Sequence, residues 1–173
     1  LNMVVHKGKT IFVGDTSVHE YPTSEQLSEI AISSARVVRL FGFDPKVAFV
    51  SHSTFGQPLT SRTKHIKDAV EILKKKNVNF EFDGDMQPDV ALDEEYKSLY
   101  PFSKIVGSAN ILIMPGQHSA AISYKMMKTL GDTKVIGPLL IGLGLPIEIA
   151  PLRSSTSEIL NLASIASYSA DVI

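Results

Sequence analysis

Three hydroxyl side chains stand close together in a segment that follows a short apolar run. The run is Val47–Val50, and the segment after it reads Ser51-His52-Ser53-Thr54-Phe55-Gly56. Small hydroxyls and free backbone N–H groups near a helix start suit phosphate oxygens. The same residue types also cap helices in ordinary solvated loops, so spacing alone leaves both interpretations open. The candidate donors to a phosphate are Ser51, Ser53, Thr54 and Gly56.

A second polar segment places Asp83, Asp85 and Asp89 within seven residues. Oxygen ligands suit Mg²⁺, but the spacing lacks the closing Glu of an EF-hand, and turn formation by Asp explains the pattern at least as well. Among the five histidines, no two have the i,i+4 spacing of a helical zinc site. The chain contains no cysteine, which excludes disulfides and thiolate metal sites. We therefore expect no metal site in this chain.

Several classes of protein are disfavoured by what the sequence lacks. It contains no Gly-x-Gly-x-x-Gly after a strand, no Walker loop and no Gly-x-Ser-x-Gly elbow, which argues against dinucleotide binding and elbow-type hydrolysis. With 17 basic and 18 acidic side chains it has no basic field for nucleic acid. The apolar stretch 135–149 is interrupted by glycines and prolines, so we expect no membrane span and no membrane partner.

The two ends of the sequence give expectations about context. The N-terminus lacks the apolar core and cleavage site of a signal peptide. The absence of cysteine suits a reducing compartment, so we expect a cytoplasmic protein. The chain begins with Leu1 rather than Met, and we expect it to be a piece of a longer protein.

Strand and helix patterns alternate along the chain and must position the polar loops. Apolar runs predict strands over 10–15, 46–51, 78–82, 111–114, 134–141 and 146–149. Helical spacing predicts helices from the Thr23–Gln26 capping box to Gly42, then over 61–76, 93–99, 118–130 and 156–169. This order predicts one three-layer α/β unit, with a mostly parallel sheet and helices on both faces. Ligands in such folds bind beyond the carboxyl ends of the strands.

Segments of the chain, taken in order from about Lys9 to the C-terminus, resemble the second half of phosphate acetyltransferases. They begin with Gly14-Asp15-Thr16-Ser17-Val18-His19 and Ser51-His52-Ser53-Thr54-Phe55-Gly56. They continue with Asp83-Gly84-Asp85-Met86-Gln87-Pro88-Asp89, Tyr100-Pro101-Phe102-Ser103-Lys104, Gly107-Ser108-Ala109-Asn110 and Ile136-Gly137-Pro138-Leu139-Leu140. Each segment is weak by itself, and the ordered set is strong.

Within that family, the chain is most similar to the C-terminal phosphotransacetylase-like domain of large bacterial NADP-dependent malic enzymes. The segments that favour it are Tyr100–Lys104, Met114–Ala120 and Asn161–Ala163. The resemblance implies a parent that decarboxylates malate oxidatively to pyruvate, with NADP and a divalent metal (Mg²⁺ or Mn²⁺) held outside this piece. It implies no cofactor here, a regulatory domain that senses acetyl-CoA or an acyl phosphate, and a homo-oligomer. It also implies a division between 1–155 and a terminal helix, 156–173, that belongs to another lobe.

One departure from the family pattern separates binding from catalysis. Phosphotransacetylases carry Ser-Arg-Gly before the final helix and an acid at its start, and the resemblance assigns these groups to the acyl phosphate and to the CoA thiol. Aligning the final helix puts Leu152 at the arginine position and Glu158 at the acid position, with Arg153 one place later. Displacing a catalytic group by about 1 Å can cost on the order of a hundredfold in rate. We therefore expect no catalytic residue, and retain phosphate acetyltransferase as the alternative.

Three further residues complete the candidate binding site. They are Ser119 and Lys125, which follow the Pro115-Gly116 turn, and Arg153. They would add polar and cationic contacts to those of the 51–56 loop.

Overall fold

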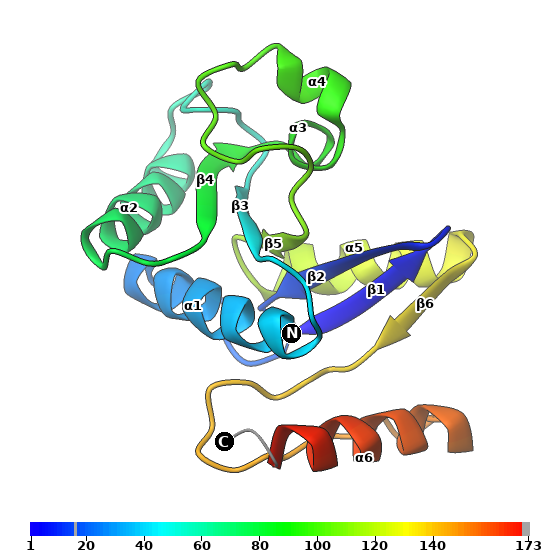
Figure 1. The fold of residues 1–173 in the computed structure, drawn as a ribbon. Helices are drawn as coiled ribbons and strands as arrows, with labels where there is room; N and C mark the ends of the chain where they lie inside the picture. Colours follow the sequence, from blue (N-terminus) through cyan, green and yellow to red (C-terminus); the bar gives the residue numbers. More distant parts are fainter. Residues whose placement is uncertain (16, 171–173) are drawn as a thin grey trace.

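A computed structural model describes residues 1–15 and 17–170, and these residues build a six-stranded sheet in the order β4-β3-β5-β2-β1-β6 (Figure 1). The strands are β1 Asn2–His6, β2 Lys9–Gly14, β3 Lys46–Val50, β4 Glu81–Met86, β5 Ile111–Ile113 and β6 Thr133–Ile136. The pairs β4–β3, β3–β5 and β5–β2 are parallel, whereas β2–β1 and β1–β6 are antiparallel. The sheet is therefore mixed, with a parallel part that carries the crossover helices.

Helices cover both faces of this sheet, which confirms the predicted α/β fold. They are α1 Ser24–Leu40, α2 Ser61–Lys75, α3 Pro88–Leu92, α4 Glu94–Ser98, α5 Gln117–Leu130 and α6 Thr156–Ala170. One core cluster joins α1 and α2 to the sheet through residues such as Phe12, Leu27 and Phe49. A second joins α3 and α5 to the other face through Met86 and Leu112. Within the part of the chain that the structure describes, no helix is long and apolar enough to cross a membrane.

Helix α1 begins where the sequence predicts. The Thr23 side chain accepts a hydrogen bond from the backbone N–H of Gln26 at 3.2 Å, and the Gln26 side chain accepts one from the Thr23 N–H at 2.8 Å. This reciprocal arrangement satisfies backbone donors that a helix start leaves free. Leu27, Ala31 and Val38 then recur at helical spacing and are buried against the sheet.

Several predicted elements needed correction. The strand predicted over 78–82 is found at 81–86, because the carboxylates that follow Phe82 are buried and bonded inside it. The strand predicted over 134–141 ends at Ile136, where Gly137 and Pro138 follow. The predicted strand 146–149 is absent apart from an isolated bridge between Leu139 and Glu148. Strand β1 and helix α3 were not predicted.

Helix α6 lies beside β6, apart from the helices that cover the parallel strands (Figure 1). Its Leu162 is buried in the cluster that contains α1 and α2, whereas Ile159, Leu160 and Tyr168 are exposed. Residues 171–173, the end of the predicted terminal segment, lie outside the described residues. The division of the chain between residues 155 and 156 stays a prediction.

Candidate functional site

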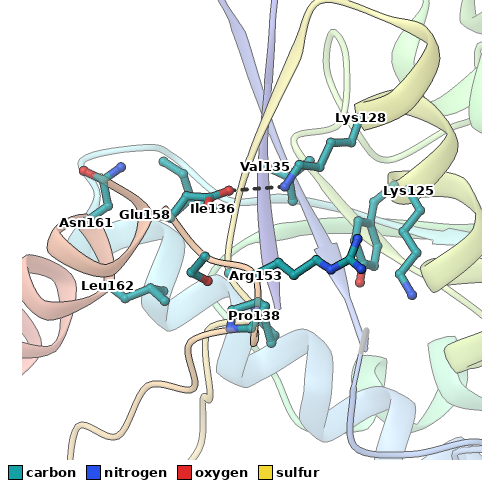
Figure 2. A pocket seen from close by; sticks show the side chains of 13 residues that line it. Lys125, Lys128, Val135, Ile136, Pro138, Arg153, Glu158, Asn161 and Leu162 are labelled. Atoms are coloured by element: carbon teal, nitrogen blue, oxygen red, sulfur yellow. Dashed lines mark hydrogen bonds and ion pairs between the residues drawn. The ribbon is translucent and has the colours of Figure 1, made fainter. Parts of the chain in front are cut away.

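A cavity of about 240 Å³ lies where the end of α5, strand β6 and the start of α6 meet. Lys125 and Lys128 line it from α5, and Arg153 extends along it toward α5 from the segment before α6 (Figure 2). These three cations face a single lining carboxylate, that of Glu158. Guanidinium and ammonium groups gathered in this way suit phosphate oxygens, which accept charge-assisted hydrogen bonds. The cavity is therefore chemically suited to a polyanion.

The periodicity of α5 explains how two lysines reach the same cavity. Ala120 is buried against the sheet, and Tyr124 and Met127 pack on the same core. Lys125 and Lys128 lie three positions apart, so they occupy neighbouring places on the helix surface beside that buried face. The apolar side of α5 thus fixes the direction in which both ammonium groups point.

Glu158 is engaged in holding the start of its own helix. Its carboxylate accepts hydrogen bonds from the N–H of Ser155 at 2.8 Å and from the Ser155 hydroxyl at 3.0 Å. The N–H of Glu158 donates back to Ser155 Oγ at 3.3 Å, which completes a capping box. The Ser155 hydrogen bonds, followed by that from Lys128 Nζ at 3.2 Å, lower the pKa of Glu158. A carboxylate held in this way is a weaker proton acceptor than a free one.

The arginine position and its neighbour differ in direction as well as in sequence. The Leu152 side chain is fully exposed to solvent, whereas Arg153 lines the cavity. The cavity therefore contains an arginine, contributed one residue later than in the family pattern. Leu152 lies outside the cavity, and Glu158 is engaged in capping α6.

The hydroxyls of the 51–56 loop are occupied within the protein. The buried Ser53 hydroxyl donates to Asp85 Oδ2, and the Gly56 N–H donates to Asp85 Oδ1 at 2.9 Å. Ser51 Oγ lies 3.2 Å from Ser53 Oγ, and Thr54 Oγ1 accepts the N–H of Gln87 at 3.3 Å. All three hydroxyl residues are buried. Asp85 thus accepts from two of the four candidate phosphate donors, Ser53 and Gly56.

The sheet also separates this loop from the cationic cavity. The loop follows β3, while the cavity adjoins β6, and β5, β2 and β1 lie between those strands. Adjacent strands are about 4.8 Å apart, so three intervening strands imply a separation on the order of 20 Å. Ser119 lies elsewhere again, in the first turn of α5, where its hydroxyl donates to the carbonyl of Gly116 at 2.8 Å. Of the seven candidate residues, the structure brings Lys125 and Arg153 together.

The model of the phosphate acetyl/butaryl transferase family matches residues 1–167. The chain belongs to this family. The matched region includes the sheet, both helical layers and most of α6.

Similar proteins fall into two groups. An NADP-dependent malic enzyme of Rhizobium meliloti is 44% identical over 170 residues, which are 98% of this chain and 22% of that protein. A phosphate acetyltransferase of Clostridium acetobutylicum is 36% identical over 157 residues, or 90% of this chain and 47% of that protein. The solved structure of a phosphotransacetylase from Streptococcus pyogenes has a TM-score of 0.92 and 30% identity, covering 99% of this chain and 54% of its own. The chain therefore spans a minor part of its malic enzyme relatives.

Sequence reasoning missed Lys128 and the capping role of Glu158, which it had named only at the acid position of the family pattern. Lys128 could have been found from its i+3 spacing to Lys125 on an expected helix. The role of Glu158 could have been read from Ser155-Thr156-Ser157-Glu158, which is a capping-box pattern. Among the described residues, no group of three His, Asp or Glu side chains is placed to hold a metal ion.

Proposed function

We propose that this chain is the C-terminal phosphotransacetylase-like part of an NADP-dependent malic enzyme and that it binds acetyl-CoA or an acyl phosphate as a regulatory ligand. The observation that carries the proposal is the cavity in which Lys125, Lys128 and Arg153 meet while the neighbouring carboxylate of Glu158 caps a helix. Such a cavity can hold phosphate groups without supplying a free base for acyl transfer. Its position between α5 and α6 would couple ligand binding to the packing of α6.

The activity of the parent belongs to the same proposal. The oxidative decarboxylation of malate would need NADP and Mg²⁺ or Mn²⁺, and the described residues of this chain show no cluster suited to the metal. We therefore assign both groups to the remainder of a longer protein. The 22% coverage of the Rhizobium meliloti malic enzyme supports this assignment. A cytoplasmic location stays a prediction that accompanies it.

Calorimetric titration of the chain with acetyl-CoA tests the ligand. Losing a hydrogen bond to a charged group costs roughly 1.5–3 kcal/mol, so Lys125→Ala or Arg153→Ala should each weaken binding at least about tenfold. Lys64→Ala is a matched control, because Lys64 is an exposed lysine on α2 paired with Asp68 at 2.8 Å. Equal affinities in all variants would remove the cavity from the site.

The same titration decides about the 51–56 loop. Ser53→Ala should leave the affinity for acetyl-CoA unchanged if Asp85 holds the loop as the structure shows. A loss of about tenfold or more in this variant would restore the loop as a ligand site. Circular dichroism of each variant confirms that the comparison is made between folded proteins.

Phosphate acetyltransferase activity is the alternative, favoured by the 36% identity to the Clostridium acetobutylicum enzyme. Thioester formation from acetyl phosphate and CoA, followed by absorbance, distinguishes the two functions. We expect no appreciable turnover, because Leu152 occupies the arginine position and Glu158 is held as a cap. A rate about tenfold above background, equal to about 1.4 kcal/mol in barrier, would favour the transferase.

The exposed apolar residues of the C-terminal part bear on assembly. Leu152, Ile159 and Leu160 present apolar surface to solvent on and before α6. We propose that the rest of the longer protein covers α6, as the predicted division at residue 155 requires, and that the protein self-associates. Analytical ultracentrifugation of the chain at high concentration tests the second point, and a clean monomer would count against self-association through this region.

A further inference from the structure

A second cavity, of about 490 Å³, lies beneath the loop that follows β2. Its walls come from that loop, from the exposed side of α1 and from the segment 138–141. Pro138 lines both this cavity and the cationic one, so the two are neighbours. We call this second cavity the loop cavity. Asp15, His19 and Ser33 are among the polar residues that line it.

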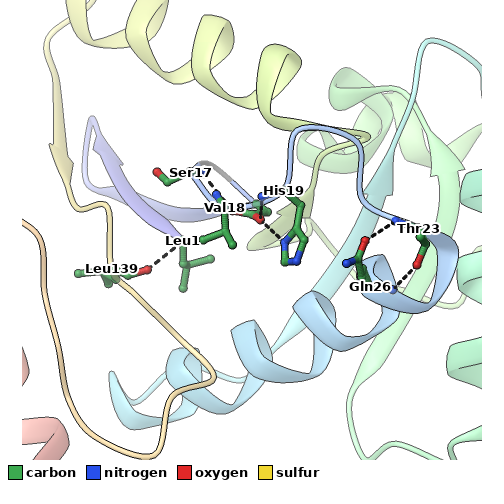
Figure 3. Close-up of polar contacts among 8 residues, drawn as sticks. Leu1, Ser17, Val18, His19, Thr23, Gln26 and Leu139 are labelled. Carbon is green, nitrogen blue, oxygen red and sulfur yellow. Dashed lines mark hydrogen bonds and ion pairs between the residues drawn. The ribbon is translucent and has the colours of Figure 1, made fainter.

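The β2 loop fixes one imidazole at the edge of the loop cavity. Asp15 Oδ1 accepts the N–H groups of Ser17 and Val18 at 3.0 and 3.2 Å, and Oδ2 accepts the N–H of His19 at 2.8 Å (Figure 3). The ring nitrogen Nδ1 of His19 lies 2.7 Å from the same Oδ2. The Asp15 side chain is buried, whereas that of His19 is 34% exposed. Asp15 thus positions the His19 ring through contacts with both its backbone N–H and its Nδ1.

The ionisation state of Asp15 determines which nitrogen of the His19 ring carries a proton. Burial raises the pKa of Asp15, but the hydrogen bonds from Ser17, His19 and Val18 outweigh it and leave that pKa below its ordinary value. An ionised carboxylate only accepts hydrogen bonds, so Nδ1 of a neutral His19 must carry the proton. The second nitrogen, Nε2, then has a free lone pair and acts as an acceptor.

The charges around the loop cavity differ from those of the cationic cavity. Its described lining contains no Lys or Arg side chain and includes the carboxylates of Asp15 and Glu29. The backbone nitrogen of Leu1 donates to the Leu139 carbonyl at 3.0 Å, so both groups are paired within the wall. The rest of the wall is largely apolar, with Ile30 and Ile141. An anion is disfavoured here, and an uncharged chain with hydrogen-bond donors is favoured.

We propose that the loop cavity holds the uncharged amide- and thioester-bearing arm of the acyl-CoA whose phosphates the proposed function places among Lys125, Lys128 and Arg153, with His19 Nε2 accepting a hydrogen bond from an amide N–H of that arm. This inference rests on the proposed function, because it takes the ligand from there. It assigns the phosphates of the ligand to the cationic cavity and the uncharged arm to the neighbouring loop cavity. His19 is then a specificity-determining residue for the arm, positioned by Asp15.

Pantetheine, which has the arm without the nucleotide phosphates, is the probe. Titration of the chain with pantetheine, followed by NMR, should show saturable binding. His19→Asn keeps a donor for Asp15 but removes the acceptor, and should weaken pantetheine about three- to tenfold, as expected for one neutral hydrogen bond. Ser33→Leu should weaken pantetheine by filling the cavity from α1 without altering the Asp15–His19 pair.

Lys125→Ala is the matched control, since it should weaken CoA binding at least about tenfold while leaving pantetheine unchanged. If CoA binds in a manner that depends on Lys125 and pantetheine shows no binding, or binds equally well to the His19→Asn and Ser33→Leu variants, the inference fails and the proposed function stands. If neither CoA nor acetyl phosphate binds, the proposed function fails, and the inference fails with it. Thermal unfolding confirms that each variant is folded.

Discussion

The strand-end loops and the segment before α6 are built from similar polar residues and differ in what those residues bond to. In the loops after β2 and β3, a buried carboxylate collects the donors of the loop itself, Asp15 in one and Asp85 in the other. In the segment 151–158, the hydroxyl of Ser155 caps a helix at the surface, and Arg153 remains directed into a cavity. The backbone donors of the first two loops are paired within the protein, whereas Arg153 of the third segment remains directed into a cavity.

The difference shows that a loop rich in Ser and Thr is a ligand site only if its donors lack an internal acceptor. A buried donor costs free energy unless it is paired, so a carboxylate that arrives from a neighbouring strand takes the place of an external anion. Asp85 reaches Ser53 from 32 positions away in the chain. In segment 151–158 the Glu158 carboxylate accepts from Ser155 and Lys128, and Arg153 lines the cavity with no carboxylate hydrogen bond of its own among the described contacts.

Among the substitutions that test this comparison, Asp85→Ala should have the largest effect on the free energy of unfolding. It leaves the Ser53 hydroxyl and the Gly56 N–H without an acceptor, at roughly 1–3 kcal/mol for each buried donor, so we expect the free energy of unfolding to fall by about 3 kcal/mol. Urea denaturation followed by circular dichroism measures it. Asp85→Asn keeps one carbonyl oxygen and should lose less; an unchanged midpoint for both variants would mean that the loop is not closed by Asp85.

The carboxylate of Asp15 should make the stability of the β2 loop depend on pH. Its folded-state pKa is lowered, so its stabilisation is present above the unfolded pKa of about 4 and is lost as the pH falls through the lower folded value. Asp15→Asn should therefore be less stable at neutral pH and should lose less stability on acidification than the original chain. Unfolding free energies measured between neutral pH and about pH 3 test this prediction. Parallel curves for the two proteins would contradict it.

Ser155→Ala removes the cap of α6 in segment 151–158. The N–H of Glu158 loses its partner, and loss of a Ser cap typically costs about 1 kcal/mol. Because α6 buries little beyond Leu162, the loss should be seen as faster amide hydrogen exchange in its first turn, with a small change in global stability. Thr156→Ala is the control for a hydroxyl in the next position.

Leu152→Ala should have the smallest effect. The side chain is fully exposed, and substitutions at such positions usually change stability by less than about 0.5 kcal/mol. Thermal unfolding of the chain measures this directly. A destabilisation above about 1 kcal/mol would show that the Leu152 side chain is covered in solution.

Local signals in the sequence were sufficient for most elements of the fold. The Thr23–Gln26 box and the helical spacing of Leu27, Ala31 and Val38 are complete within one segment, so α1 could be predicted at its true start. Strand β1 gave no such signal, since Asn2–His6 is short and is defined by pairing with β2 and β6. Helix α3 begins with Pro at its first position, a start signal that the adjacent aspartates obscured.

The site could be predicted in part only, because its chemistry depends on long-range contacts. Two of the residues predicted to bind a ligand, Lys125 and Arg153, line the same cavity, and their role in binding stays a prediction. The Ser53 hydroxyl is bonded to Asp85 on another strand, and this contact could not be predicted from the spacing of residues in the sequence. Asp15 and His19 are only four positions apart, so their contact could have been predicted from the sequence. The cavity that His19 lines could not, because distant segments form its walls.

The pairing of β1 on both sides has a consequence for the order of folding. The hairpin β1–β2 is local in sequence, whereas the other edge of β1 pairs with β6, where Met3 lies opposite Ile136. During synthesis, β1 therefore waits with an open edge until nearly the whole domain has been made. Contacts of such sequence separation slow folding, and an open edge strand invites pairing with other chains. Early termination before residue 133 should thus yield an aggregation-prone product in which the parallel strands have formed and the first strand has no second neighbour.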